Sequence, residues 1–93
     1  MKTILITGAN GFIGSNLVSS LIRKKNLKII AIDIVKKKLA YNLKKYFLIK
    51  NVEYFSIDIC NLSKLNKIFF KFKPSIVYHL AASVGVSNYI QKP

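Results

Sequence analysis

Three glycines near the start of the chain have the spacing of a phosphate-binding turn. Gly8, Gly11 and Gly14 follow an apolar run at residues 2–7. Gly8 permits a sharp exit from a strand, because it has no Cβ to obstruct the backbone. Gly11 lets the main chain approach a pyrophosphate, and Gly14 lets the next helix pack closely on the strand. The first turn of that helix would then offer free N–H groups and partial positive charge to phosphates.

An acidic residue completes the pattern. Asp33 ends the next apolar run, 29–32, about twenty residues beyond the glycines. A carboxylate there accepts hydrogen bonds from an adenosine ribose and disfavours a 2′-phosphate. The order is G-x-x-G-x-x-G, and Ser15-Asn16 after the last glycine excludes the Gly-Lys-Ser/Thr loop of ATPases. The combination predicts a dinucleotide site, and the alternative is a plain strand-turn-helix whose glycines serve geometry alone.

The apolar pattern predicts four strands alternating with three helices. Short apolar runs indicate parallel strands buried on both faces, and apolar residues at helical spacing indicate the helices between them. In chain order the expected elements are strand 2–7, helix 13–25, strand 29–32, a lysine-rich helix at 37–48, strand 52–56, helix 62–73 and strand 75–80. This order predicts part of a Rossmann-type α/β fold, a three-layer parallel sheet with strand order 3-2-1-4. The ligand is expected outside the carboxyl ends of the first and fourth strands.

The ends and faces of these helices also have sequence signals. Asn26 is expected as a left-handed residue after the first helix, which Arg23 to Lys25 would close. Asn61 or Ser63 would cap the third helix, and Pro74 would end it. In that helix five apolar residues are expected to face inward: Leu62, Leu65, Ile68, Phe69 and Phe72.

Composition limits the other possibilities. Sixteen Lys and Arg against three Asp and Glu give a net charge of +13, which leaves a nucleic-acid-binding protein as one alternative. The lysines are spread along the chain and Arg23 is the single arginine, so a solvated basic surface is favoured. The single cysteine, Cys60, indicates a reducing compartment, and no apolar run reaches membrane-spanning length. We expect a cytoplasmic protein.

Several segments together resemble a known family. Residues 7–17, Asp33, Asp58-Ile59 and His79-Leu80-Ala81-Ala82 resemble the extended short-chain dehydrogenase/reductases. Within them the similarity is to the NAD-dependent epimerase/dehydratase group, which acts on nucleotide sugars. Residues 79–86, followed by 91–93, are most similar to 4-epimerases of UDP-glucose or UDP-glucuronate.

This resemblance implies roles for single residues. The pyrophosphate would be held by Gly8, Gly11, Phe12, Ile13 and Gly14. Asp33 would bind the adenosine ribose, and Asp58 and Ile59 the adenine edge. The path to the nicotinamide ribose would be lined by Leu80, Ala81 and Ala82, with Ser83 and Val84 as further candidates. The alternative for each alanine is ordinary packing, and His79 is expected to be a packed strand residue. The implied cofactor is NAD; three lysines at 36–38 leave NADP as a less favoured alternative, and no metal ligand is assigned.

The resemblance also implies chemistry that these residues do not perform. The family transfers hydride from a sugar hydroxyl to NAD with a Tyr-x-x-x-Lys pair that lies after a fifth strand. Two pairs match that spacing by chance, Tyr41 with Lys45 and Tyr46 with Lys50, and neither is assigned a role. We therefore expect residues 1–93 to be the N-terminal part of an NAD(P)-binding Rossmann domain, without the catalytic and substrate-binding part. The full-length enzyme would bind a nucleotide sugar and form a homodimer. The alternative is a non-enzymatic NAD(P)-binding regulatory module.

Overall fold

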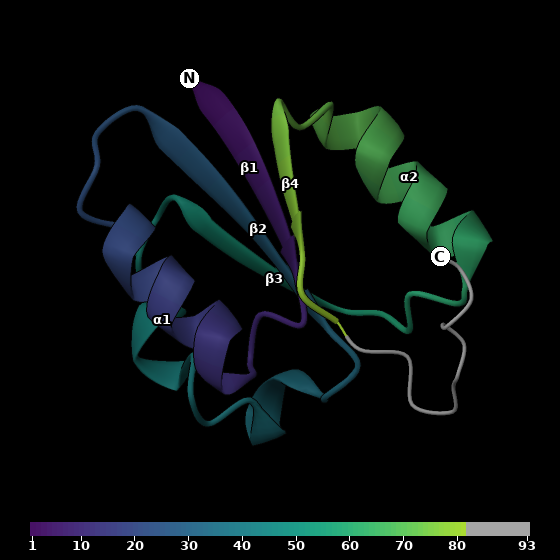
Figure 1. The fold of residues 1–93 in the computed structure, drawn as a ribbon, viewed down its shortest axis with the longest axis horizontal. Helices are drawn as coiled ribbons and strands as arrows, with labels where there is room; N and C mark the ends of the chain where they lie inside the picture. The colour runs from purple at the N-terminus through teal and green to yellow at the C-terminus, as the bar shows by residue number, and fades with distance from the viewer. Residues whose placement is uncertain (82–93) are drawn as a thin grey trace.

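The computed structural model describes residues 1–81, which form a parallel sheet with helices on both faces (Figure 1). The elements are β1 (Lys2–Thr7), α1 (Phe12–Leu21), β2 (Leu27–Asp33), η1 (Lys37–Leu39), η2 (Lys44–Tyr46), β3 (Val52–Ser56), α2 (Leu62–Phe72) and β4 (Ile76–His79). The four strands have the order β3-β2-β1-β4, and every pair is parallel. The Rossmann-type fold and the predicted strand order are confirmed.

The central strand β1 shows why the sheet is covered twice. Leu5 and Ile6 are both completely buried, although consecutive strand residues point to opposite faces. Ile6 packs in one apolar cluster with Val18 of α1, whereas Leu5 packs in a second cluster with Ile68 of α2. The two helices therefore lie on opposite faces of the sheet (Figure 1).

The lysine-rich helix expected at 37–48 is not formed. The segment instead makes two short 3₁₀ turns, η1 and η2. Between them the backbone N–H of Asn42 donates to the side-chain oxygen of Asn10 at 3.0 Å. A continuous helix would direct that N–H to the carbonyl four residues earlier, so the tertiary bond competes with the helix. The spacing of the buried residues also fits 3₁₀ turns, because Ala40 and Leu43 are buried and lie three residues apart.

The first and last helical boundaries differ slightly from the prediction. α1 ends at Leu21, so the cations at 23–25 lie in the turn after the helix, where Asn26 has the expected left-handed backbone (φ 63°). Asn61 is the cap of α2, because its side chain accepts from the backbone N–H of Lys64 at 3.2 Å. α2 ends at Phe72, before Pro74, and Lys73 takes the left-handed conformation (φ 45°).

The prediction that five apolar residues of α2 face inward is wrong for two of them. Leu65, Ile68 and Phe72 contact the sheet cluster, whereas Leu62 is 64% and Phe69 37% exposed. At 100° per residue, the three contacting positions form one narrow stripe along the helix. Leu62 and Phe69 lie beside this stripe, on the side that turns toward solvent. A helix of this length covers the sheet with that one stripe.

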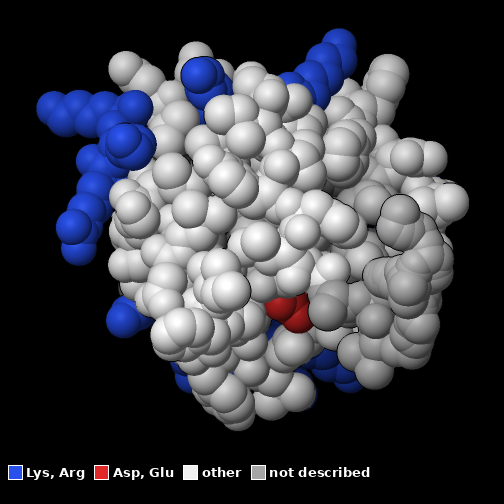
Figure 2. Space-filling view, viewed as in Figure 1, with Lys and Arg blue, Asp and Glu red and all other residues white. Residues whose placement is uncertain are grey.

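β4 is the edge of the sheet next to β1. All four of its residues are exposed, including Ile76, Val77 and Tyr78. Lys and Arg gather at the margins of the face seen in Figure 2, and an acidic group lies in the hollow near its centre. No helix within residues 1–81 is long and apolar enough to cross a membrane.

Candidate functional site

The glycine turn has the geometry that its sequence predicts. Gly8 has a left-handed backbone (φ +67°), and an added Cβ would lie 2.7 Å from the backbone nitrogen of Ala81. A Cβ on Gly14 would lie 2.8 Å from the Cα of Ala9 and would overlap the carbonyl oxygen of Gly8. Gly11 has more room, since its Cβ would meet only that same carbonyl oxygen at 3.3 Å. Gly8 and Gly14 are therefore required by the fold, while Gly11 leaves space beside the turn.

The N-terminus of α1 opens onto this space. Gly11 is the N-cap residue, and no side chain caps the helix there. The first helical hydrogen bond runs from the N–H of Ser15 to the carbonyl of Gly11 at 2.9 Å. The preceding N–H groups thus have no partner within the helix. By contrast, the N-terminus of α2 is closed by Asn61. The uncapped turn of α1 is suited to an anion.

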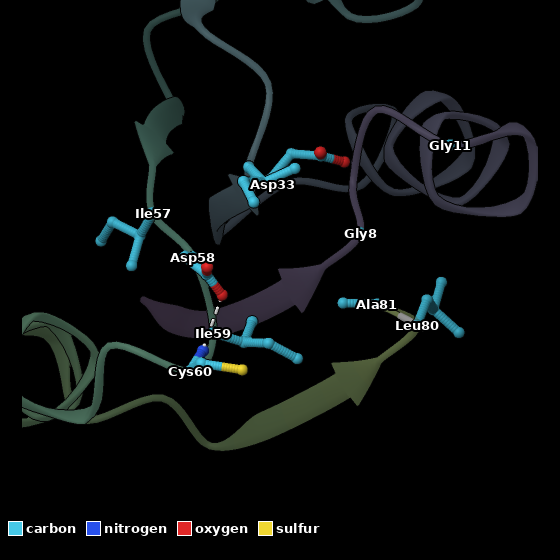
Figure 3. Close-up of a pocket in the computed structure, with 10 residues that line it drawn as sticks. Gly8, Gly11, Asp33, Ile57, Asp58, Ile59, Cys60, Leu80 and Ala81 are labelled. Atoms are coloured by element: carbon cyan, nitrogen blue, oxygen red, sulfur yellow. Dashed lines mark hydrogen bonds between the residues drawn. The ribbon is translucent and has the colours of Figure 1, made fainter. Parts of the chain in front are cut away.

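Asp33 lies at the carboxyl end of β2, beside the glycine turn (Figure 3). One carboxylate oxygen accepts from the backbone N–H of Asn10 at 2.9 Å, and the other accepts from that of Val35 at 3.2 Å. Each oxygen keeps acceptor capacity beyond this one bond. The carboxylate is therefore fixed in place and can still accept hydrogen bonds from ribose hydroxyls.

Tyr54 of β3 supports the same corner. Its hydroxyl donates to the carbonyl oxygen of Val35, whose N–H donates to Asp33. Burial of the ring, and then the negative charge of Asp33, raise the pKa of Tyr54 from 10.0 to about 12. The hydroxyl therefore stays protonated and able to donate at neutral pH.

A cavity of about 430 Å³ joins these groups, which is within the size range of small-molecule sites. Figure 3 shows its lining from the ends of β1, β2, β3 and β4. Seven of the predicted residues line it: Gly8, Gly11, Asp33, Asp58, Ile59, Leu80 and Ala81. An adjoining hollow is lined by the rest of the turn, Phe12, Ile13 and Gly14. The structure thus brings ten predicted residues together at the edge of the sheet where the four strands have their carboxyl ends; the eleventh, Ala82, lies outside the described residues.

Three further residues line the cavity that the sequence did not mark as site residues: Ile34, Ile57 and Cys60. Each lies next to, or two residues from, a predicted acid. The signal that could have identified them is their place in the loops after β2 and β3, beside Asp33 and Asp58. Ile34 is 65% exposed, and Cys60 is exposed with a free thiol. The N–H of Cys60 donates to the carboxylate of Asp58 at 2.9 Å, which shapes this loop. Ile34 and Ile59 give the cavity apolar walls suited to a flat ring.

Thr7 is another residue that the sequence reasoning missed. It is almost fully buried, and its hydroxyl oxygen lies 2.8 Å from Nδ1 of His79. The same oxygen accepts from the backbone N–H of Ala81 at 3.2 Å. These bonds tie the carboxyl ends of β1 and β4 together. His79 is exposed, so the expectation that it packs as an ordinary strand residue is wrong. Residues on an edge strand lack the neighbour that would cover them.

The acidic residues are concentrated at the cavity. The chain has only three Asp and Glu, and two of them, Asp33 and Asp58, line it. The third, Glu53, pairs with Lys28 at 2.9 Å on the sheet. Two carboxylates at the cavity favour hydroxyl donors and disfavour an added phosphate. The net charge of +13 attracts anionic ligands to the molecule as a whole.

Comparison with known proteins agrees with this geometry. The family model described as GDP-mannose 4,6 dehydratase matches residues 5–93. The chain belongs to this family. The match confirms the resemblance to NAD-dependent epimerases and dehydratases of the short-chain dehydrogenase/reductase type. A dTDP-glucose 4,6-dehydratase of Neisseria meningitidis is 34% identical to this family member over 95 residues, which cover 97% of the chain and 26% of the relative.

Two solved structures show the same fold around a bound cofactor. A dTDP-glucose 4,6-dehydratase of Bacillus anthracis, in complex with NAD, matches with a TM-score of 0.81 at 27% identity, covering 90% of this chain and 28% of the other. A UDP-glucuronic acid 4-epimerase of Bacillus cereus, in complex with UDP-glucuronic acid and NAD, matches with a TM-score of 0.74 at 31% identity, covering 96% and 30%. The family member described here therefore spans about a quarter to a third of the length of these relatives.

Proposed function

We propose that the chain is the NAD-binding portion of an enzyme that acts on nucleotide sugars. The observation that carries the proposal is the pairing of an uncapped helix N-terminus with Asp33 across one cavity. Gly8 and Gly14 are required by the packing of the turn, and Gly11 leaves the space beside it that a close ligand would occupy. NAD-bound relatives with the same fold support the choice of ligand.

The residues of this chain would divide the dinucleotide between them. The turn from Gly8 to Gly14 would hold the pyrophosphate through backbone N–H groups. Asp33 would accept hydrogen bonds from the adenosine ribose, while Asp58 and Ile59 would contact the adenine. Leu80 and Ala81 would lie along the path to the nicotinamide end. Bound NAD would supply a hydride acceptor for a sugar hydroxyl carbon. The chain's own contribution is binding and orientation.

NAD is favoured over NADP by the charges at the cavity. Asp33 would meet a 2′-phosphate with a carboxylate whose two oxygens are already held in place by backbone N–H groups. Of the three lysines that could compensate, Lys37 lies over the ring of Phe47, 5.1 Å from its centroid. An ammonium in that position is drawn to an aromatic face on the chain itself.

The reaction of the whole protein is proposed at the level of the family. Residues 79–86 resemble 4-epimerases, and the curated relative from Neisseria meningitidis is a 4,6-dehydratase. Both activities use a nucleotide sugar, so we propose a nucleotide-sugar epimerase or dehydratase. A homodimer in a reducing, cytoplasmic compartment is part of this proposal, on the family resemblance and the lone Cys60.

Calorimetric titration tests the proposal. A sample shown to be folded by circular dichroism is titrated with NAD, ADP-ribose and NADP. We expect NAD and ADP-ribose to bind to one site and NADP to bind about tenfold more weakly, because of the charge at Asp33. A folded sample with no affinity for NAD or ADP-ribose would overturn the proposal. Binding of generic duplex DNA beyond that of a charge-matched control protein would favour the nucleic-acid alternative instead.

A further inference from the structure

Two asparagines that lie far apart in the sequence bond to each other at the edge of the site. The backbone N–H of Asn42 donates to the side-chain oxygen of Asn10 at 3.0 Å. The side-chain amide of Asn42 donates in return to the backbone carbonyl of Asn10 at 2.8 Å. We call this pair of bonds the asparagine clamp. It joins the glycine turn to the segment between η1 and η2.

The clamp fixes the backbone on both sides of Asn10. The peptide before Asn10 is held because its N–H donates to Asp33 at 2.9 Å. The peptide after it is held twice, since its carbonyl accepts from Asn42 and its N–H, that of Gly11, donates to Gly8 at 3.1 Å. Gly11 is the N-cap of α1. The direction in which α1 begins therefore depends on a bond from Asn42.

Asn42 contributes little else to the fold. Its side chain is exposed, and the neighbouring Leu43, which is fully buried, already anchors the segment in the core. Exposed substitutions away from caps and networks change stability only slightly. The structural contribution of the Asn42 side chain is thus concentrated in its bond to Asn10.

We propose that Asn42 is a positioning residue of the dinucleotide site, which holds the glycine turn in its binding geometry through Asn10. This inference rests on the proposed function, because it assigns the clamp to the binding of NAD. Asn42 lies outside the lining of the cavity, so it acts through the turn and not by contact with the ligand. A turn that is already ordered loses less conformational freedom when a ligand binds.

The test uses single variants and their combination. Asn10→Ala removes the acceptor of one bond, and Asn42→Ala removes the donor of the other. Asn42→Gln keeps an amide donor as a conservative variant. Asn66→Ala is the matched control, because Asn66 is exposed on α2, on the far side of the sheet from α1. Each protein is titrated with NAD, and each is digested with trypsin without NAD, since lysines at 36–38 and 44–45 flank Asn42.

We expect Asn10→Ala and Asn42→Ala each to weaken NAD binding about fivefold, the effect of one neutral hydrogen bond, with the binding stoichiometry unchanged. The double variant should be less affected than the product of the two single effects, because both bonds belong to one clamp. Asn42→Gln should bind closer to the unsubstituted chain, and Asn66→Ala should match it. Tryptic cleavage between 36 and 45 should be faster in both alanine variants.

The outcomes separate the clamp from the proposed function. Variants that are cleaved faster but bind NAD with unchanged affinity would show a purely structural clamp and overturn the positioning role. Unchanged cleavage and unchanged affinity would overturn the clamp altogether. A fall in stoichiometry with unchanged affinity would indicate partial unfolding and would also overturn the positioning role. Absence of NAD binding by the folded, unsubstituted chain would overturn the proposed function, and the positioning role with it, whatever the digestion shows.

Discussion

The backbone N–H of Asn10 donates to the carboxylate of Asp33 over 2.9 Å, and this bond joins the glycine turn to the end of β2. The two parts of the proposed site, one for phosphate and one for ribose, are therefore one hydrogen-bonded unit. Changes to either part are expected to reach the other, which makes substitutions at this corner informative.

The ribose-binding role of Asp33 gives the first prediction. Asp33→Ala should weaken NAD binding by about tenfold or more, because hydrogen bonds to a charged group are lost. Lys37→Ala should have a smaller effect, since Lys37 faces the ring of Phe47. Calorimetric titration of both variants checks the ranking. The reverse ranking would favour NADP or a different position of the ligand.

The three glycines should differ in what their loss affects. Gly8→Ala and Gly14→Ala should each lower the free energy of unfolding by about 1–3 kcal/mol, because the new Cβ would overlap the backbone. Gly11→Ala should be milder in stability, with its Cβ 3.3 Å from one carbonyl oxygen, yet should weaken NAD binding because Gly11 lines the cavity. Urea unfolding and NAD titration separate the two effects. A Gly14→Ala variant as stable as the unsubstituted chain would contradict the packing described here.

Tyr54 should make stability depend on pH at the alkaline end. Its pKa is 10.0 in the unfolded chain and about 12 in the folded one, so the folded state holds the proton more tightly. The stability that this contributes is complete below pH 10 and is lost as the pH rises toward 12. Unfolding measured across this range should show a decline that is smaller in Tyr54→Phe, which lacks the phenol group. An equal decline in both proteins would assign the pH dependence to other groups.

Cys60 offers a direct probe of the cavity. It is exposed and lines the cavity, and it is the chain's single cysteine, so any thiol signal comes from it. Saturating NAD should slow the reaction of Cys60 with a thiol reagent several-fold, because the adenine end would cover it. The chain denatured in urea serves as the control and should react equally with and without NAD. Equal rates in the folded chain would place the ligand elsewhere.

The sequence was sufficient where local chemistry decides the structure. The positive φ of Gly8 and the close approach at Gly14 follow from the need for a sharp turn and a tightly packed helix. Asp33 reaches the cavity because it ends a strand parallel to β1, whose carboxyl end lies at the same edge of the sheet. These features depend on residues close in the chain or on neighbouring strands of a known order.

Features that depend on distant partners were not predictable. The expected helix at 37–48 failed because Asn42 bonds to Asn10, 32 residues away. Thr7 bonds to His79, which is 72 residues away, and sequence periodicity does not predict a pair so far apart. Hydrophobic periodicity also does not predict how wide the buried stripe of a helix is. For this reason Leu62 and Phe69 were predicted to face inward although they are exposed.

The position of β1 has a consequence for synthesis on the ribosome. β1 is central, but its two neighbours come at very different times, β2 soon afterwards and β4 only after residues 76–79 have emerged. Until then one side of β1 in the nascent chain has no strand beside it, which is a state prone to mispairing. Productive folding of this segment should therefore benefit from chaperones that shield that side until β4 arrives.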